Sequence, residues 1–372
     1  MSKNILFVNT AHFSHDDRTF YHQAVSLVGK DYNVTIVSSK EELKLTKSGI
    51  NIDSFDDTTL SRKAGIKEIK KRICQYAPQI IICDSPISVI AASSAKQKNT
   101  TIIYDVTEWF PSKKNLQNVV GIKRIIKFCA AAMLNFYAGL KTNKFIFGEY
   151  YKFVPFKLFF WKKSIEIPYF PDLKYIKRYP LKEISNEITI LYSGGLNEDK
   201  GFNNVIDVVH KLALTHQKLK INLKIIASFL SESEKIYFEK LIFNLPQNIH
   251  IHLSGFLPFL EYCQTIGNAD LFLDLRKIDT ENTRCLPIKL FYYLACGRPV
   301  IYSDLKAIQK KTANSDFIHL VNPKDIQSIC VIINNYIKNQ DLYEKQSMKA
   351  RKAAENEYNW KIIEKRFIDF VQ

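Results

Sequence analysis

Two stretches of the sequence combine the residue types that bind phosphate groups. In ITILYSGGLNEDKGFNNVIDVV, Gly194 and Gly195 follow an apolar run, and Lys200 precedes a helical pattern. Glycine lets the backbone approach a phosphate closely, the start of a helix offers unpaired amides, and lysine adds a full charge. The stretch therefore predicts a diphosphate-binding loop. The alternative is an ordinary strand-to-helix turn, because glycines are common in such turns without any ligand.

The second stretch is ADLFLDLRKIDTENTRCLPIKLFYYLACGRPVIYSD, in which a strand ends at Asp274 and a helix begins near Pro287. Proline suits a helix start because its missing amide would be unpaired there. Three cations here could neutralise a bound diphosphate: Arg276, Arg284 and Lys289. Glu281 or Asp279 in the same loop could contact the rest of such a ligand, which the family resemblance given below implies is a sugar. For Arg284 the alternative is a solvated loop of mixed charge.

Polar residues also follow strands that are predicted in the first half of the chain. Ligands of doubly wound sheets bind outside the carboxyl ends of the strands, so these residues are candidates for an acceptor side: Asp17, Arg18, Asp105, Thr107 and Glu108. Arginine suits a planar partner such as phosphate or carboxylate. The alternative for Asp16, Asp17 and Arg18 is a helix cap with its neighbours. The histidines in this region lack a metal spacing on one helix face and receive no role: His12, His15 and His22.

Two series of alternating strands and helices must position these residues. NILFVNT, a helical pattern over residues 19–28 and NVTIVSS form the first unit, which QIIIC, TIIYD and KFIFG continue. IEIPYFPDLKYIKRYPLKEISNE contains three prolines and little periodicity, which marks a linker. A second series then runs through EITILYS, INLKIIA, IHIHL, LFLDL and PVIYS. The predicted fold is α/β, with two Rossmann-like domains whose doubly wound parallel sheets face each other across a cleft.

The charge of the chain indicates a polyanionic partner. The formal net charge is +16, and residues 121–163 hold nine Lys or Arg and twelve aromatic residues against one acid, Glu149. This pattern favours an interfacial surface, because aromatic rings prefer the headgroup region and basic side chains prefer an anionic leaflet. The alternative is that the aromatic residues are core and the lysines a solvated face. No nucleic-acid-binding motif accompanies the charge, so no nucleic acid partner is expected.

Other features exclude several classes of protein. The seven cysteines lack the spacing of a zinc site, and we expect reduced thiols in a cytosolic protein. The opening MSKNILFVNTAHF alternates like a strand and does not resemble a secretory signal. The longest uncharged window, residues 128–140, is too short to span a bilayer. We expect no metal site and no cofactor.

Both phosphate-binding stretches carry a family resemblance. PIKLFYYLACGRPVIYSD resembles the PxKLFEYMAxGxPVIxSD signature of family 4 of the GT-B glycosyltransferases (group 1), and GGLNEDKG resembles that family's donor-phosphate loop. HDDRTFYHQAVSL resembles the loop and helix after the family's first strand, and YDVTE resembles its VYDxHE motif. The resemblance implies transfer from a nucleoside-diphosphate sugar, with retention at the anomeric carbon. It also implies a role in making capsule, lipopolysaccharide, exopolysaccharide or glycolipid.

The resemblance also assigns residues to the donor by position. It implies that the diphosphate, the ribose and the nucleobase are contacted by Gly194, Gly195, Lys200, Leu286, Pro287 and Phe256. The family's paired glutamates correspond to Arg284 and Tyr292, and its first-domain histidine corresponds to Thr107. We therefore predict Arg284 and Glu108 as catalytic residues, and we predict that the Tyr292 hydroxyl bonds a ribose oxygen more weakly than a carboxylate would.

The predicted domains are an acceptor-side domain at 1–168, a linker at 169–186, a nucleotide-sugar-binding domain at 187–354 and a C-terminal helix at 355–372. That helix could cross back to the first domain. The predicted function is a cytoplasmic glycosyltransferase for a saccharide or lipid-linked acceptor, with peripheral membrane contact through residues 121–163. One alternative is a catalytically silent accessory protein of the same fold, motivated by the replaced glutamates and histidine. Another is a nucleotide-sugar epimerase, which the phosphate loop alone does not exclude.

Overall fold

The computed structural model describes residues 3–30, 32–108, 110–112, 116, 119–312 and 315–372. Two compact units divide the chain. Unit 1 comprises Met1–Tyr169 together with Ile363–Gln372, and unit 2 comprises Phe170–Ile362. Most of the stretch predicted as a linker, residues 170–186, thus lies in unit 2, and the end of the C-terminal helix lies in unit 1. None of the helices in the described ranges is long and apolar enough to cross a bilayer.

Unit 1 is built on a sheet that, in the described residues, has eight strands in the order β3-β4-β2-β1-β5-β6-β7-β8. All neighbouring pairs are parallel except β3 with β4. The strands other than β3 and β8 are mostly buried, as expected of a sheet covered on both faces. They are β1 (Asn4–Asn9), β2 (Asn33–Ser38), β3 (Lys40–Lys47), β4 (Ile50–Asp56), β5 (Ile80–Cys83), β6 (Thr101–Val106), β7 (Lys144–Phe147) and β8 (Lys163–Glu166).

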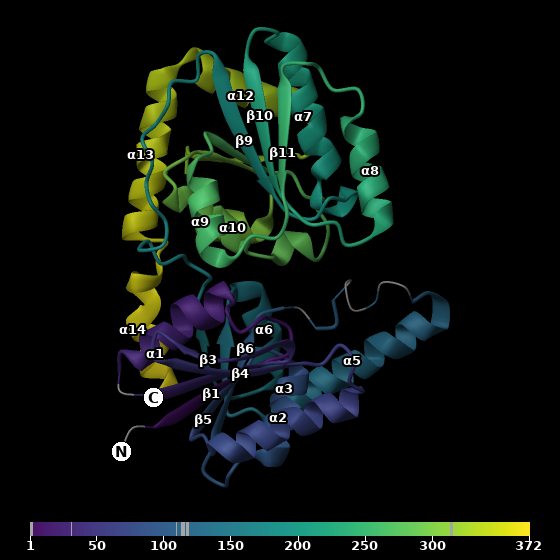
Figure 1. Ribbon diagram of the computed structural model, residues 1–372, viewed down its shortest axis with the longest axis vertical. Helices are drawn as coiled ribbons and strands as arrows, with labels where there is room; N and C mark the ends of the chain where they lie inside the picture. The colour runs from purple at the N-terminus through teal and green to yellow at the C-terminus, as the bar shows by residue number, and fades with distance from the viewer. Residues whose placement is uncertain (1–2, 31, 109, 113–115, 117–118, 313–314) are drawn as a thin grey trace. The chain divides into compact units, whose positions relative to one another are not determined.

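The helices of unit 1 follow the predicted alternation. Helices α2, α3 and α5 pack side by side, and Ser85 caps α3 with Pro86 in its first turn (Figure 1). The segment predicted as one helix over residues 19–28 is a π-helix, η1, followed by a single α-helical turn. The helices are η1 (Asp17–Ala24), α1 (Val25–Val28), α2 (Arg62–Tyr76), α3 (Pro86–Ala95), α5 (Gly121–Lys141) and α6 (Tyr150–Phe159); α14 (Trp360–Val371) ends the chain.

Unit 2 contains a parallel sheet with six strands in the described residues, in the order β11-β10-β9-β12-β13-β14. The strands are β9 (Glu187–Ser193), β10 (Lys220–Ile226), β11 (Ile249–Ser254), β12 (Leu271–Asp274), β13 (Val300–Ser303) and β14 (Ile318–Val321). Together with unit 1, this confirms the predicted α/β fold with two parallel-sheet domains. Its helices are η2 (Glu198–Lys200), α7 (Phe202–Thr215), α8 (Glu232–Ile242), α9 (Phe259–Gly267), η3 (Asn282–Arg284), α10 (Ile288–Ala295), α11 (Lys306–Thr312), α12 (Ile326–Lys338) and α13 (Gln340–Asn356).

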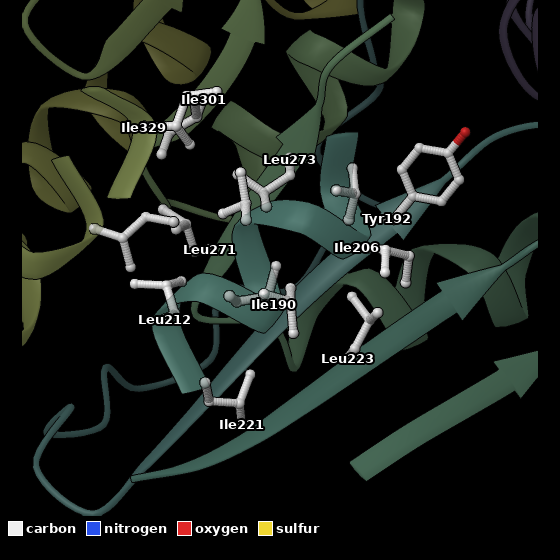
Figure 2. Packing of buried hydrophobic residues seen from close by; sticks show 14 of the residues in the cluster. Ile190, Tyr192, Ile206, Leu212, Ile221, Leu223, Leu271, Leu273, Ile301 and Ile329 are labelled. Atoms are coloured by element: carbon white, nitrogen blue, oxygen red, sulfur yellow. The ribbon is translucent and has the colours of Figure 1, made fainter. Parts of the chain in front are cut away.

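The core of unit 2 lies between its sheet and α7, which packs beside α8 and α12. Figure 2 shows Ile206 and Leu212 of α7 packed among side chains of β9, β10 and β12. Arg298 is buried and fastens residues of the linker stretch to this unit, since its guanidinium donates to the carbonyls of Tyr179 (3.3 Å) and Pro180 (3.2 Å). The core therefore holds the carboxyl ends of β9 and β12 at fixed positions.

Candidate functional site

The glycine loop of unit 2 is shaped by the hydroxyl of Tyr192. That hydroxyl donates to the carbonyl of Gly195 (2.6 Å) and also lies 3.3 Å from the carbonyl of Lys200. A Cβ atom on Gly194 would lie 2.7 Å from the same hydroxyl, so this position excludes other residues. The loop thus has a structural reason for its glycine beside the predicted ligand contact.

The turn between β9 and α7 is tight and brings two loops together. The side chain of Asn197 accepts from the amide of Lys200 (3.1 Å) and so caps the short helix η2. Gly201 follows in the left-handed region with φ 72°, where a Cβ atom would overlap the carbonyl of Leu275. The predicted strand, loop and helix are therefore present, and α7 begins directly beside the chain that leaves β12.

Lys289 is a cation at the carboxyl edge of the sheet of unit 2. It stands in the first turn of α10, and its Nζ donates to the carbonyl of Ser193 at the end of β9 (2.5 Å). Its pKa is lowered to about 8, chiefly by burial; Asp274 opposes this shift, and the nearby charges of Arg276 and Lys200 add to it. The charged lysine is therefore held at an electrostatic cost, which a bound anion would relieve.

Arg276, which was expected to contact the ligand, forms an ion pair with Asp274. Its Nε donates to one carboxylate oxygen (2.7 Å) and its Nη2 to the other (2.5 Å), while Tyr302 donates to the same carboxylate (2.6 Å). Burial alone would raise the pKa of Asp274, but Arg276 outweighs it and lowers that pKa. The pair is nearly neutral as a whole, so Lys289 and Lys200 carry the excess positive charge.

Asp279 orders the polar loop after β12, and its contact with the sugar stays a prediction. Its carboxylate accepts from the amides of Glu281 and Asn282, both at 2.9 Å. Such a side chain organises a turn by satisfying backbone donors. Arg284 ends the following short helix η3, and its side chain is exposed.

The remaining donor candidates divide into surface and interior residues. Phe256 follows β11 and is 78% exposed, so its ring is accessible to a planar base. Leu286 and Pro287 are buried, and Pro287 is the N-cap residue of α10. Tyr292 is 2% exposed and packs near the rings of Phe259 and Tyr262. Its side chain is part of the core of unit 2, and the contact of its hydroxyl with a ribose stays a prediction.

In unit 1, Arg18 and Asp105 form a buried ion pair. Arg18 donates from Nε (2.7 Å) and Nη2 (2.9 Å) to the two carboxylate oxygens, and its guanidinium lies 3.9 Å from the ring centroid of Tyr169. Gln23 donates to the same carboxylate (2.7 Å). Burial alone would lower the pKa of Arg18, but Asp105 raises it above its ordinary value. The pair thus has a structural role, and a contact of either residue with the acceptor stays a prediction.

The other acceptor-side candidates lie at the ends of the same strands. Asp16 caps η1 by accepting from the amides of Arg18 and Thr19, which agrees with the capping alternative, and Asp17 stands in the first turn. Thr107 is half-buried, and its hydroxyl donates to the carbonyl of Asp84 (3.3 Å). Glu108 is exposed beyond the end of β6. Of these residues, Glu108 presents its carboxylate to solvent.

Comparison with known proteins identifies the second half of the chain. Residues 176–353 match the model of the family described as Glycosyl transferases group 1. The matched residues lie within unit 2, which is therefore similar to the group 1 glycosyltransferases. This agrees with the resemblance read from its two phosphate-binding stretches. No curated protein sequence matches significantly.

Solved glycosyltransferase structures share the fold of this chain at low identity. A sucrose-phosphate synthase from Thermosynechococcus elongatus has a TM-score of 0.74 at 14% identity, covering 99% of this chain and 98% of that one. Anabaena Alr3699/HepE in complex with UDP-glucose has a TM-score of 0.73 at 14% identity, covering 99% of this chain and 98% of that one. WaaG, a glycosyltransferase involved in lipopolysaccharide biosynthesis, has a TM-score of 0.70 at 13% identity, covering 98% of this chain and 99% of that one. The fold is thus that of the GT-B glycosyltransferases.

The first unit of this GT-B chain contains a charged pair to which the sequence assigned no role. His12 Nδ1 lies 3.2 Å from Asp84, whose carboxylate also accepts from the amides of Thr10 and Ala11, both at 2.9 Å. Burial alone would lower the pKa of His12, but its hydrogen bond to Asp84 and nearby carboxylates raise it to about 9. His12 is therefore a cation at neutral pH. The sequence could have indicated this pair, because His12 and Asp84 follow the adjacent parallel strands β1 and β5.

Proposed function

We propose that the protein transfers a sugar from a nucleoside-diphosphate sugar, and that the diphosphate binds at the carboxyl edge of β9 and β12 in unit 2. The observation that carries this proposal is the partly buried Lys289 against the end of β9, with Lys200 nearby and Arg276 already paired. A lysine 4 Å from a phosphate gains about 4 kcal/mol at an effective dielectric of 20, before desolvation is subtracted. The similarity of unit 2 to the group 1 glycosyltransferases supports the same ligand.

In the proposed reaction, fixed cations stabilise the negative charge that develops on the leaving diphosphate. Lys289 and Lys200 would contact it from the strand edge, and Arg284 would approach from its exposed loop. Glu108 is proposed as the carboxylate of unit 1 that contacts the sugar or the acceptor, since Asp105 is occupied by Arg18. Retention of configuration is proposed on the family resemblance.

The donor can be found by thermal shift. The screen contains UDP, GDP and CMP and their sugars. We expect one nucleotide sugar to raise the melting temperature of the protein clearly at saturation. Ligand at 100 times its Kd stabilises the native state by about 2.7 kcal/mol. UDP is the first nucleotide to test because HepE was solved with UDP and with UDP-glucose. No shift with any nucleotide or sugar would contradict a donor site and favour a catalytically silent protein.

We further propose that the acceptor is membrane-bound and that residues 121–163 hold the protein peripherally on an anionic leaflet. Helix α5 buries only Ala138 and Gly139 among its residues, and Trp161 is 96% exposed. The apolar residues exposed on α5 include Ile122, Ile125, Ile126 and Met133, and the basic residues Lys123, Arg124 and Lys127 are exposed on the same helix. Exposed apolar and basic residues together favour an interface.

The alternative interpretation holds for part of the segment, because Phe145 and Phe147 of β7 and Phe160 are buried in the core. The exposed residues of α5 are the ones that support membrane contact. Flotation with vesicles that contain phosphatidylglycerol tests this proposal. Absence of binding to those vesicles at low salt would contradict it.

A further inference from the structure

A cavity of about 220 Å³ lies in unit 1 between the end of β6, α5 and α6. Its walls are mainly aromatic. Phe136 of α5 packs with its ring centroid 6.5 Å from that of Phe159 and 5.4 Å from that of Phe160, and Phe156 lies 5.8 Å from Phe160. Ala132 of α5 and Val106 of β6 also line it. Three segments distant in sequence thus form a pocket with a hydrocarbon surface.

The polar residues around the cavity are already engaged with the protein. Asn135 donates to the carbonyl of Phe110 (3.0 Å) and lies 3.4 Å from the hydroxyl of Tyr104. Lys152 is buried, donates to the carbonyl of Thr107 (2.5 Å) and lies 3.1 Å from Glu149. Glu108 is the exposed polar group at the pocket. The interior therefore suits an apolar ligand, and an apolar cavity of about 150 Å³ is already large enough to bind benzene.

Two walls of the pocket also belong to the exposed apolar surface of α5 and α6. Phe136 is 48% exposed and Phe159 is 69% exposed. Met133, Phe136 and Leu140 are three and four residues apart, so they share one face of α5. The pocket therefore shares two wall residues with the surface that we propose contacts the bilayer.

We propose that this pocket binds the hydrocarbon chain of the membrane-bound acceptor, near the point where its polar head begins. The proposal rests on the proposed function, since it requires a lipid-linked acceptor. Each methylene that moves from water into an apolar pocket strengthens binding. The exposed carboxylate of Glu108 stands where the hydroxyl-bearing head of the acceptor would emerge.

The pocket can be filled from within without altering the outer face. Ala132→Phe places a ring in the cavity, and Ala130→Phe, two residues earlier on α5, adds the same ring to an exposed position outside it. The probe is n-decyl phosphate below its micelle concentration, titrated by calorimetry. We expect wild type and Ala130→Phe to bind it equally and Ala132→Phe to bind at least about 10-fold more weakly. Inorganic phosphate should bind none of them at the same concentrations.

Two outcomes would overturn the proposal. One is equal decyl phosphate binding by all three proteins, which would place the chain elsewhere. The other is a loss of flotation with anionic vesicles in Ala132→Phe alone, which would mean that the pocket holds bulk lipid as an anchor. Equal flotation of both variants supports the acceptor chain as the occupant. A thermal shift with UDP, measured in parallel, tests the proposed function separately, because the donor residues lie in unit 2.

Discussion

Lys289→Met is expected to weaken UDP binding by about 30-fold or more while unit 2 stays folded. Removing one partner of a desolvated charge pair costs about 2–5 kcal/mol of affinity. The methionine fills the space of the lysine stem without the charge. Calorimetric titration with UDP at pH 7 measures the change in Kd.

The stability of Lys289→Met should move in the opposite direction from its affinity. The folded protein holds the pKa of Lys289 at about 8, below its ordinary value of 10.5. The charged lysine therefore destabilises the fold below about pH 8, and this cost disappears as pH rises towards 10.5. We expect the variant without ligand to melt at the same temperature as wild type or higher.

Lys218→Met is the matched control for Lys289→Met. Lys218 is exposed just before β10, which begins at Lys220, so it lies at the amino end of the same sheet. The Lys218→Met variant should bind UDP with the same Kd as wild type. Equal Kd values for the two variants would show that Lys289 does not contact the donor.

Arg18→Met should destabilise unit 1 by about 3–5 kcal/mol, because it leaves the carboxylate of Asp105 buried without its cation. For a unit of this size, the effect corresponds to a fall in melting temperature of roughly 10 °C. Hydrogen exchange of the β1 and β6 amides measures the change in unit 1 itself, which matters because a two-unit chain need not unfold in one step.

The control for this prediction is Arg62→Met, which removes an exposed arginine at the start of α2. The double variant Arg18→Met/Asp105→Leu should recover much of the loss, since a buried ion pair can be replaced by apolar residues of similar volume. If Arg18→Met is no less stable than Arg62→Met, then the buried pair contributes little and Arg18 is available for a ligand.

Most of the parallel core strands were predictable because they are short apolar runs that alternate with helical patterns. β3, β4, β8 and β14 were not predicted, and the sequences of β3 and β8, KEELKLTK and KSIE, are largely polar. β3 is an edge strand, and charged side chains are common on edges because they prevent pairing with other chains. Only the sheet itself shows that such a segment is extended.

The candidate site was predictable as a set of loops but not as a set of contacts. The motifs place Lys200, Arg276 and Lys289 near one edge, and in the structure Arg276 and Lys200 are close enough to Lys289 to lower its pKa. Pairing could not be read from the sequence: Arg276 meets Asp274 two residues away, whereas Arg18 meets Asp105 eighty-seven residues away. The burial of Tyr292 could not be predicted either, because its position in a helix does not tell which face of that helix is buried.

Proton uptake on UDP binding tests the central claim most directly. UDP is titrated at pH 8 in two buffers of different ionisation enthalpy, into wild type and into Lys289→Met. A diphosphate beside Lys289 should raise its pKa from about 8, so wild type should take up about half a proton per UDP and the variant almost none. Tight UDP binding without proton uptake, at equal affinity in both proteins, would contradict a donor site at Lys289.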